Sequence, residues 1–453
     1  MLFNSFSFLF LFLPLALAIA SRLRGQWLLA FVAGASFLFY AWAGEPWFLV
    51  PMLFTILLDF ILARFLGATS DPRKRMALLL VSLFFNLGFL VFFKYAGLIG
   101  QHTGILASLV ALGLPAGISF YTFQSVSYMV DVYRKEKEPE KNILKYAGFI
   151  SFFPHLVAGP LTRHSQLIPQ LSRVSAEGIR PHWRGGIALF VIGLAKKVII
   201  ADRIDDSVGP LLSFGGQLDF FSAWLALFGF TLQIYFDFSG YSDMAIGLGR
   251  LFGIELPQNF NSPYQATSPR DFWARWHITL SQFFRDYLYI PLGGSRHGNL
   301  RTALNLLLTM FLAGLWHGAT WLFGLWGIYH AFWLILHHQG EGAWNRMPSA
   351  LQKIITLLIV MCGWVIFSSG SLRQCAGWMS ALLGGRGLGD LSAVDPLLLP
   401  LLFTAGVIAL FLPNASRRNF NEMRAGLQLQ LAGAFVVAVL MIHFSSKFIY
   451  FKF

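Results

Sequence analysis

The chain has 453 residues, of which 56% are hydrophobic and only 12% are charged. An average soluble domain carries about 25% charged residues, so this composition is typical of a membrane protein, and no polar stretch is long enough to form a separate soluble domain. The net charge of +13 would suggest a nucleic-acid partner in a soluble protein, but here the basic residues gather in short loops between apolar segments, so we expect no nucleic acid.

Apolar segments near the length that crosses a bilayer follow one another through the first third of the chain. They cover residues 6–20, 27–42, 47–62, 76–93 and 106–132. The first is expected to be a retained span and not a signal peptide, because its basic residues Arg22 and Arg24 come after it. Arg73, Lys74 and Arg75 follow the third segment. By the positive-inside rule these loops are cytoplasmic, and the N-terminus is expected outside.

The rest of the chain continues the pattern with interruptions. Residues 143–158 are expected to enter the bilayer and return, because Pro154 and Pro160 break a continuous helix and basic residues lie on both sides. Residues 270–286 alternate aromatic and charged side chains, which indicates a helix in the interface or along a cavity. Further apolar segments are 186–200, 222–236, 302–338 (two spans joined near 318–320), 354–367, 396–412 and 427–443.

These segments predict an all-α, polytopic integral membrane protein. We expect about 11 or 12 membrane segments, some of them re-entrant or interfacial, within a single domain that covers residues 1–453.

His317 is the polar residue that stands out. It lies in "LAGLWHGATW", within a stretch from Thr302 to Gly340 that contains no Asp, Glu, Lys or Arg. An ionisable group in hydrocarbon costs about 2.5 to 3.5 kcal/mol on insertion scales, so such groups usually face a cavity and mark a site. Two interpretations stay open from the residues alone: a proton-exchanging histidine, or a neutral one that is hydrogen-bonded at a helix junction.

Other polar residues in apolar surroundings give weaker evidence of a functional site. His277 lies among Arg275, Asp271 and other charges, so its charge state cannot be inferred, and structural and functional roles are open. Asp237 and Asp243 are predicted to pair with the arginines of the segment from Arg270 to Arg285. His330 stands alone among aromatic residues and is interpreted as a core or cavity-lining residue.

Several kinds of site are excluded by the sequence. It has no H-E-x-x-H, P-loop, G-x-S-x-G or G-x-G-x-x-G motif. Cys362 and Cys375 form no C-x-x-C pair, and we expect no metal site. A general base that acts on a bound hydroxyl group remains as the chemistry to expect.

Five motifs in order carry a resemblance to a known family. They are "SFYTFQSVSYMVDVYR", "FFPHLVAGPLTR", "DFWARWHITLSQFFRDYLYIPLGGSR", "GLWHGATWLFGLWGIYHA" and the terminal "FIYFKF". Together they resemble the membrane-bound O-acyltransferase family, in particular its bacterial branch of alginate O-acetyltransferase type. The similarity covers essentially the whole chain.

The resemblance implies a ring of spans around a central funnel, where a cytoplasmic acyl donor meets an acceptor from the other face. It implies that His317 is catalytic, as the histidine of the W-H-G motif, and that His277 is also required. Trp316, Gly318 and His277 are candidate oxyanion donors. The residues that we expect to contact substrate are Trp316, Arg275, Trp276, Asp237 and Ser239.

The resemblance also implies partners and a location. We expect no bound cofactor, acetyl-CoA or another acyl thioester as donor, a polysaccharide acceptor, and a separate periplasmic acetyltransferase of SGNH type at the bacterial inner membrane. D-alanyl transfer to teichoic acid and peptidoglycan O-acetylation are alternatives within the same fold. A proton-coupled transporter that uses His317 and His277, or an assembly scaffold, are alternatives of other classes.

Overall fold

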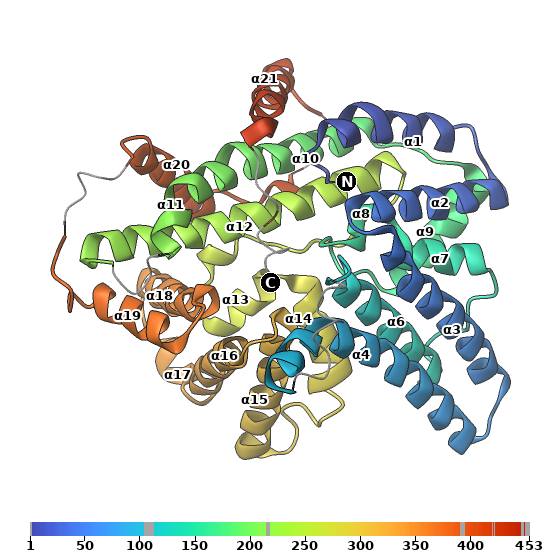
Figure 1. Ribbon diagram of the computed structural model, residues 1–453, viewed down its shortest axis with the longest axis horizontal. Helices are drawn as coiled ribbons and strands as arrows, with labels where there is room; N and C mark the ends of the chain where they lie inside the picture. Colours follow the sequence, from blue (N-terminus) through green and yellow to red (C-terminus); the bar gives the residue numbers. More distant parts are fainter. Residues whose placement is uncertain are drawn as a thin grey trace. The chain divides into compact units, whose positions relative to one another are not determined.

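The computed structural model describes residues 2–103, 113–213, 218–389, 395–418, 420, 422–444 and 448. Regular structure within these residues is entirely helical (Figure 1), which confirms the all-α prediction. Among the described residues, five helices are long and apolar enough to cross a membrane, namely Gly25–Trp42, Pro46–Ala68, Pro72–Tyr95, Phe220–Leu251 and Ser349–Ser368. The chain is therefore a multi-pass membrane protein. Three shorter apolar helices are Phe8–Ala20, Leu398–Phe411 and Ala425–Met441.

The helices of the first half mostly follow the predicted segments. They are α1 (Leu13–Ala20), α2 (Gly25–Ala43), α3 (Leu49–Ala68), α4 (Pro72–Thr103), α6 (Ile118–Tyr133), α7 (Ile143–Ser151), α8 (Phe153–Leu156), α9 (His164–Glu177), α10 (Trp183–Ala195) and α11 (Asp202–Ser213). A π-helical turn, Phe8–Phe12, precedes α1, and another, Lys196–Ala201, joins α10 to α11.

In the second half, α12 is longer than the predicted segment 222–236. The helices of this half are α12 (Phe220–Leu251), α13 (Pro269–Arg275), α14 (Ile278–Phe284), α15 (Gly298–His317), α16 (Trp321–Gln339), α17 (Glu341–Trp344), α18 (Ser349–Ser368), α19 (Leu372–Leu382), α20 (Leu398–Phe411) and α21 (Ala425–Met441). A short 3-10 helix, Pro263–Gln265, precedes α13, and a π-helical turn, Arg285–Tyr289, follows α14.

Three predicted segments differ from the structure. The start of the expected span 106–132 lies outside the described residues, and α6 begins only at Ile118, after Gly117 in a left-handed conformation. The segment 143–158 is divided, as expected, but the break is at Phe152 between α7 and α8. The single helix expected over 270–286 is wrong, because the chain turns at Trp276 and His277 and forms α13 and α14 instead.

The contacts of the chain divide it into two compact units. Unit 1 contains residues 1–191, 242–257 and 419–431, and unit 2 contains residues 192–241, 258–418 and 432–453. The ring of spans around a funnel, and the single domain over 1–453, therefore stay predictions, and each unit is described by itself.

In unit 1, Arg75 holds the ends of three helices together. It lies in the first turn of α4, and its Nη2 donates to the carbonyl oxygens of Val132 (3.0 Å) and Tyr133 (2.8 Å) at the end of α6. Its Nη1 donates to the carbonyl oxygens of Leu66, near the end of α3, and Thr69 (3.2 Å). The guanidinium group thus satisfies carbonyl groups that a helix leaves unpaired at its C-terminus.

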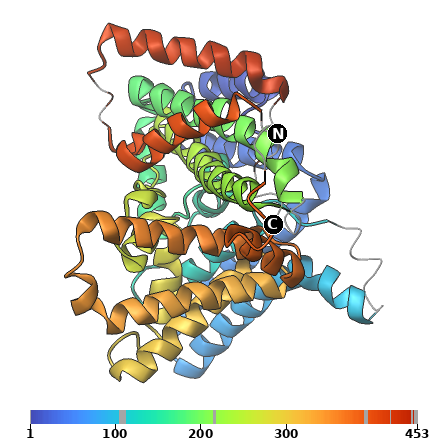
Figure 2. The same cartoon turned by 90° about the vertical axis from the view of Figure 1, so that its left-hand side faces the viewer.

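In unit 2, α15 and α16 form an antiparallel hairpin whose helices lie side by side in both views (Figures 1 and 2). Glycines make this close approach possible. A Cβ atom on Gly314 would clash with the carbonyl oxygen of Phe323, and one on Gly327 would clash with that of Met310. The turn at residues 318–320 confirms the predicted junction between two helices.

A methyl group at the hairpin contact should separate the two helices. We predict that Gly327→Ala destabilises the protein by about 1 to 3 kcal/mol, because its Cβ would meet backbone that cannot move aside. Thermal unfolding of the purified protein in detergent measures the loss. The matched control is Gly433→Ala in α21, where a Cβ meets no atom within 4 Å. Equal midpoints for the two variants would contradict the prediction.

Candidate functional site

His317 is the last residue of α15 and lies at the turn of the hairpin. Gly318 follows in an extended conformation, and a side chain there would collide with the ring of Phe323. A glycine at this position therefore leaves room for Phe323 of α16 directly after the helix ends. The imidazole of His317 is held at the end of a rigid element instead of on a mobile loop.

Aromatic rings surround His317. Its ring centroid lies 4.8 Å from that of Trp316, 5.1 Å from that of Trp326 and 5.4 Å from that of Phe367, each in an edge-to-face arrangement. Such a wall restricts the orientation of the imidazole. The side chain nevertheless remains partly exposed, unlike Trp316 and Trp326, which are buried.

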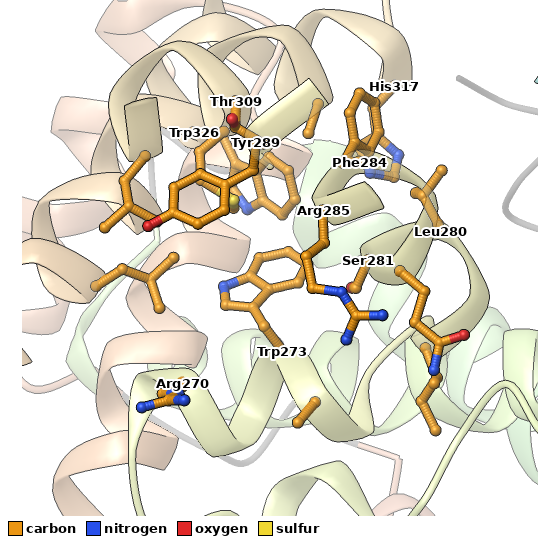
Figure 3. Close-up of a pocket in the computed structure, with 17 residues that line it drawn as sticks. Arg270, Trp273, Leu280, Ser281, Phe284, Arg285, Tyr289, Thr309, His317 and Trp326 are labelled. Atoms are coloured by element: carbon orange, nitrogen blue, oxygen red, sulfur yellow. The ribbon is translucent and has the colours of Figure 1, made fainter. Parts of the chain in front are cut away.

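The exposed side of His317 faces a cleft of about 440 Å³. The α13–α14 region lines one wall and the hairpin lines the other; Figure 3 shows the labelled side chains converging on the space between them. Thr309, Met310, Ala313 and His317 are spaced so that they share one face of α15. The full lining is Arg270, Trp273, Ala274, Ile278, Leu280, Ser281, Gln282, Phe284, Arg285, Tyr289, Leu306, Thr309, Met310, Ala313, His317, Trp326 and Leu334.

His277 occupies a strained position between α13 and α14. Its φ and ψ angles of 43° and 52° are left-handed, which is uncommon for a residue with a side chain. Two features hold it there. The Ile278 N–H donates to the carbonyl oxygen of Asn259 (2.9 Å), and the side-chain oxygen of Asn259 lies 3.1 Å from Nδ1 of His277. Strain of this kind persists only where surrounding contacts determine it.

Asn259 also determines which nitrogen of His277 carries the proton. Its Oδ1 accepts from the backbone N–H (3.3 Å) and the hydroxyl group (2.9 Å) of Thr279, so this atom is the amide oxygen and not the nitrogen. A carbonyl oxygen cannot donate. Nδ1 of His277 is therefore the donor, and Nε2 is the ring's proton-accepting nitrogen in the neutral form.

His277 does not line the cleft but lies behind it. Its side chain is 1% exposed, and burial lowers its pKa to about 3, so the ring is neutral at physiological pH. Its centroid is 6.2 Å from that of Trp316, whose ring is in turn beside His317. The structure thus brings the two predicted histidines close, with Trp316 in contact with both rings.

The other residues predicted from this motif are packed away from the cleft. Trp276 is buried and stacks on Phe272 with ring centroids 5.7 Å apart. Nε of Arg275 donates to Oδ1 of Asp271 at 2.7 Å. His330, 2% exposed, packs against the ring of Trp273, which confirms its assignment to the core.

Asp237 and Ser239 belong to a different polar cluster, around two lysines of the π-helical turn. Nζ of Lys197 lies 2.6 Å from Oδ1 of Asp237 and 2.7 Å from Oδ1 of Asp202, and all three side chains are at most 3% exposed. Lys196 donates to the hydroxyl group of Ser239 at 3.4 Å. The residues that line the cleft include neither Asp237 nor Ser239.

The predicted pairing of Asp237 with the arginines of residues 270–285 is therefore wrong. Its ion pair is with Lys197, whereas Arg275 pairs with Asp271 and Arg285 with Asp286. The reason is geometric. The two arginines have carboxylates within four residues along the chain, and the π-helical turn carries Lys197 to α12. Asp243, the other acid of this segment, is also buried.

Sequence reasoning missed several residues that line the cleft. Arg270 and Arg285 were interpreted as ion-pair partners in a segment at the interface or along a cavity, and Tyr289 and Thr309 were not singled out. The helical spacing of Thr309, Ala313 and His317 was visible, but the face of α15 that borders a cavity depends on where α13 and α14 pack. Among the described residues, no group of three or more His, Cys, Asp or Glu side chains could hold a metal ion.

Comparisons with known proteins show which family and which relatives this sequence resembles. Residues 133–371 match the model of the "MBOAT, membrane-bound O-acyltransferase family". Over 352 residues, 75% of this chain, the sequence is 40% identical to the "Probable alginate O-acetylase AlgI" of Pseudomonas aeruginosa, of whose length the match covers 66%.

Two further relatives have other names. The "Peptidoglycan O-acetyltransferase" of Helicobacter pylori is 35% identical over 390 residues, which cover 78% of this chain and 73% of that protein. The "Teichoic acid D-alanyltransferase" of Bacillus subtilis is 30% identical over 272 residues, which cover 56% of this chain and 68% of that protein.

The buried, neutral state of His277 predicts a pH-dependent stability. In an unfolded chain a histidine has a pKa of about 6.5, but His277 in the folded protein has a pKa of about 3. Protons therefore bind the unfolded state preferentially. The stabilisation is complete above about pH 6.5 and is lost as the pH falls toward 3, by at most about 1.4 kcal/mol per pH unit for this group.

We predict that His277→Gln makes the decline in thermal unfolding midpoint between pH 7.5 and pH 4.5 shallower. Glutamine keeps a donor for Asn259 but has no group that titrates in this range. His297→Gln, at an exposed position, should retain the full decline. An identical slope for His277→Gln and the unmodified protein would refute the assigned state of His277.

Proposed function

We propose, because this chain belongs to the membrane-bound O-acyltransferase family, that it transfers an acetyl group from a cytoplasmic acyl thioester toward an extracytoplasmic polysaccharide. The observation that carries the proposal is the position of His317. It is a histidine at a helix end, partly exposed to a cleft of about 440 Å³, in a segment that has no Asp, Glu, Lys or Arg between Thr302 and Gly340.

In the proposed reaction His317 is the general base. Its neutral imidazole removes the proton from an acceptor hydroxyl group as that oxygen attacks the thioester carbonyl carbon. The tetrahedral intermediate collapses, the carbon–sulfur bond breaks, and the imidazolium returns its proton to the leaving thiolate, so that ester and free thiol are formed. Such a base contributes about 10²- to 10⁴-fold in rate. The aromatic wall keeps water from the thioester.

The structure narrows the roles of the candidate oxyanion donors. The Gly318 N–H donates to the carbonyl oxygen of Leu315 at 3.2 Å, and Nδ1 of His277 faces Asn259. In its neutral form His277 therefore offers an acceptor, Nε2, and no second donor. We assign His277 a positioning role beside Trp316. Trp316 is buried and is not among the residues that line the cleft, so its predicted contact with substrate stays a prediction.

The proposal includes a location and partners. The basic loops after α1 and α3 support an inner-membrane protein whose N-terminus is periplasmic, with the donor on the cytoplasmic side. Acetyl-CoA or another acyl thioester is the proposed donor. A separate periplasmic acetyltransferase of SGNH type is the proposed partner that places the acetyl group on the polymer.

One observation favours peptidoglycan as a second candidate acceptor. The Helicobacter pylori relative is named a peptidoglycan O-acetyltransferase, and the match covers 78% of this chain. Alginate-like polymers and peptidoglycan are both polysaccharides with free hydroxyl groups, so the same chemistry serves either. Acetate content of each polymer in a deletion strain decides between them.

We predict that His317→Ala lowers acetylation of the polymer by about 10²- to 10⁴-fold, because the general base is removed. Ester-linked acetate released from the purified polymer measures the loss, and an immunoblot of membranes shows that the protein is retained. His297→Ala, at the exposed residue just before α15, is the control and should acetylate normally.

Acetylation by the His317→Ala variant also distinguishes an enzyme from a transporter. Unchanged acetylation in His317→Ala would reject the enzyme mechanism. Flux of a solute through liposomes that contain the purified protein, without any release of thiol from the donor, would instead favour a transporter that uses His317.

A further inference from the structure

Asp59 is an acidic side chain in the middle of a membrane-spanning helix of unit 1. It lies on α3, about 14 Å along the helix from the last residue, Ala68, at 1.5 Å per residue. Its side chain is 0% exposed. An ionisable group at this depth is costly and usually marks a site. The proposed acyl transfer gives Asp59 no role, so its position needs another explanation.

Two side chains of α4 hold the carboxyl group of Asp59. The hydroxyl group of Ser82 donates to Oδ1 at 2.6 Å, and Nδ2 of Asn86 donates to Oδ2 at 2.9 Å. These two donors lie on successive turns of α4, which packs along α3 (Figure 1). Both oxygen atoms of Asp59 therefore act as acceptors, which is the role of an ionised carboxylate.

No positive charge from the described part of the chain balances this carboxylate. None of the ion pairs between described residues includes Asp59, and no basic side chain is among the groups that interact with it. Arg64 on the same helix is exposed, and Arg75 donates to carbonyl groups at helix ends. A buried charge without a partner is strongly destabilising, so the site requires a cation from outside the chain, either a proton or a metal ion.

Three oxygen atoms near the carboxylate favour a metal ion. They are Oδ1 of Asn86, Oγ of Ser125 on α6 and the hydroxyl oxygen of Tyr146 on α7, and each is buried without a hydrogen-bond partner among the described residues. Ser125 lies beside both Asp59 and Tyr146. A proton on Asp59 would serve one of these oxygen atoms, whereas a metal ion contacts several at once. Carboxylate, carbonyl and hydroxyl oxygens are ligands of hard cations.

We propose that a sodium ion binds at the Asp59 cluster and joins α3, α4, α6 and α7. The cluster consists of Asp59, Ser82, Asn86, Ser125 and Tyr146, whose side chains are at most 1% exposed. One carboxylate balances one positive charge, so the ion is monovalent. Cavity size and ligand number decide between cations of similar chemistry, and side chains from four packed helices leave little room for the larger potassium ion. With one acid and no histidine or cysteine, this site differs in kind from the metal sites considered above.

Thermal unfolding of the purified full-length protein in detergent tests the site. Midpoints are compared in sodium chloride, potassium chloride and N-methylglucamine chloride at equal ionic strength, so that general charge screening is the same in each. Asp59→Asn keeps the shape of the side chain and removes its charge. The matched control is Asp206→Asn, which removes the same charge from an exposed position on α11.

We expect the unmodified protein to unfold about 2 to 5 °C higher in sodium chloride than in either other salt, because the ion binds the folded state alone. Asp206→Asn should show the same difference, and Asp59→Asn should have equal midpoints in all three salts. Radioactive sodium should bind the unmodified protein at equilibrium and fail to bind Asp59→Asn. This second measurement does not depend on stability.

Ser125→Ala separates an ion ligand from a structural hydroxyl group. Without an ion, removal of a buried hydroxyl group that makes no hydrogen bond should leave the unfolding midpoint unchanged or raise it, and should leave sodium dependence as it was. As a ligand of sodium, its loss should raise the sodium concentration that gives half of the stabilisation by about 10-fold.

Equal midpoints of the unmodified protein in sodium chloride and potassium chloride would overturn the proposal. If no sodium binds either, Asp59 carries a proton instead. Sodium-dependent stabilisation that Asp59→Asn retains would also overturn it. If Asp59→Asn does not fold, Ser125→Ala decides, because an unchanged sodium affinity of that variant rejects the site. These results are independent of the acyl transfer proposed for His317.

Discussion

The backbone contact between α15 and α16 is the constraint on which the cleft depends. Gly314 and Gly327 allow each helix to touch carbonyl groups of the other, where any side chain would collide. In a lipid environment the hydrophobic effect does not drive helices together, so close packing of small residues provides much of the association. The resulting hairpin is rigid, ends α15 at His317, and directs one face of each helix toward α13 and α14.

The buried polar groups of this protein follow the same physical rule in three places. Lys197 is enclosed with two carboxylates, His277 with Asn259, and Arg75 with the carbonyl groups at two helix ends. Each arrangement supplies hydrogen bonds that water would otherwise make, because an unsatisfied polar group away from water costs several kcal/mol. His317 differs from these groups, since it borders a cleft and stays partly exposed. That difference sets it apart as the group with access to an external ligand.

The two histidines have different surroundings. His277 is enclosed, strained and held in one tautomer by Asn259, so it provides a fixed acceptor behind Trp316. His317 has aromatic neighbours and a cavity, which suit a base that must meet a substrate.

Much of the helical framework could be predicted from local patterns. Apolar segments near the length that crosses a bilayer predicted α2, α3, α18 and the hairpin of α15 and α16, including its turn at residues 318–320. The unusual position of His317 was also visible, because an ionisable side chain in an apolar stretch is costly wherever the chain places it. The five motifs identified the family without any coordinates.

What the sequence by itself determined is therefore most of the long apolar helices, their membrane character and the unusual position of His317. Only the tertiary structure decided that Asp237 pairs with Lys197 and that His277 is hydrogen-bonded to Asn259. It also decided that Arg270 lines the cleft. The physical reason is that helix formation depends on side chains three and four residues apart, whereas an ion pair or a cavity wall depends on which distant segments pack together. Arg275 has its carboxylate four residues earlier on the same helix, whereas packing alone places Arg270 beside a cavity.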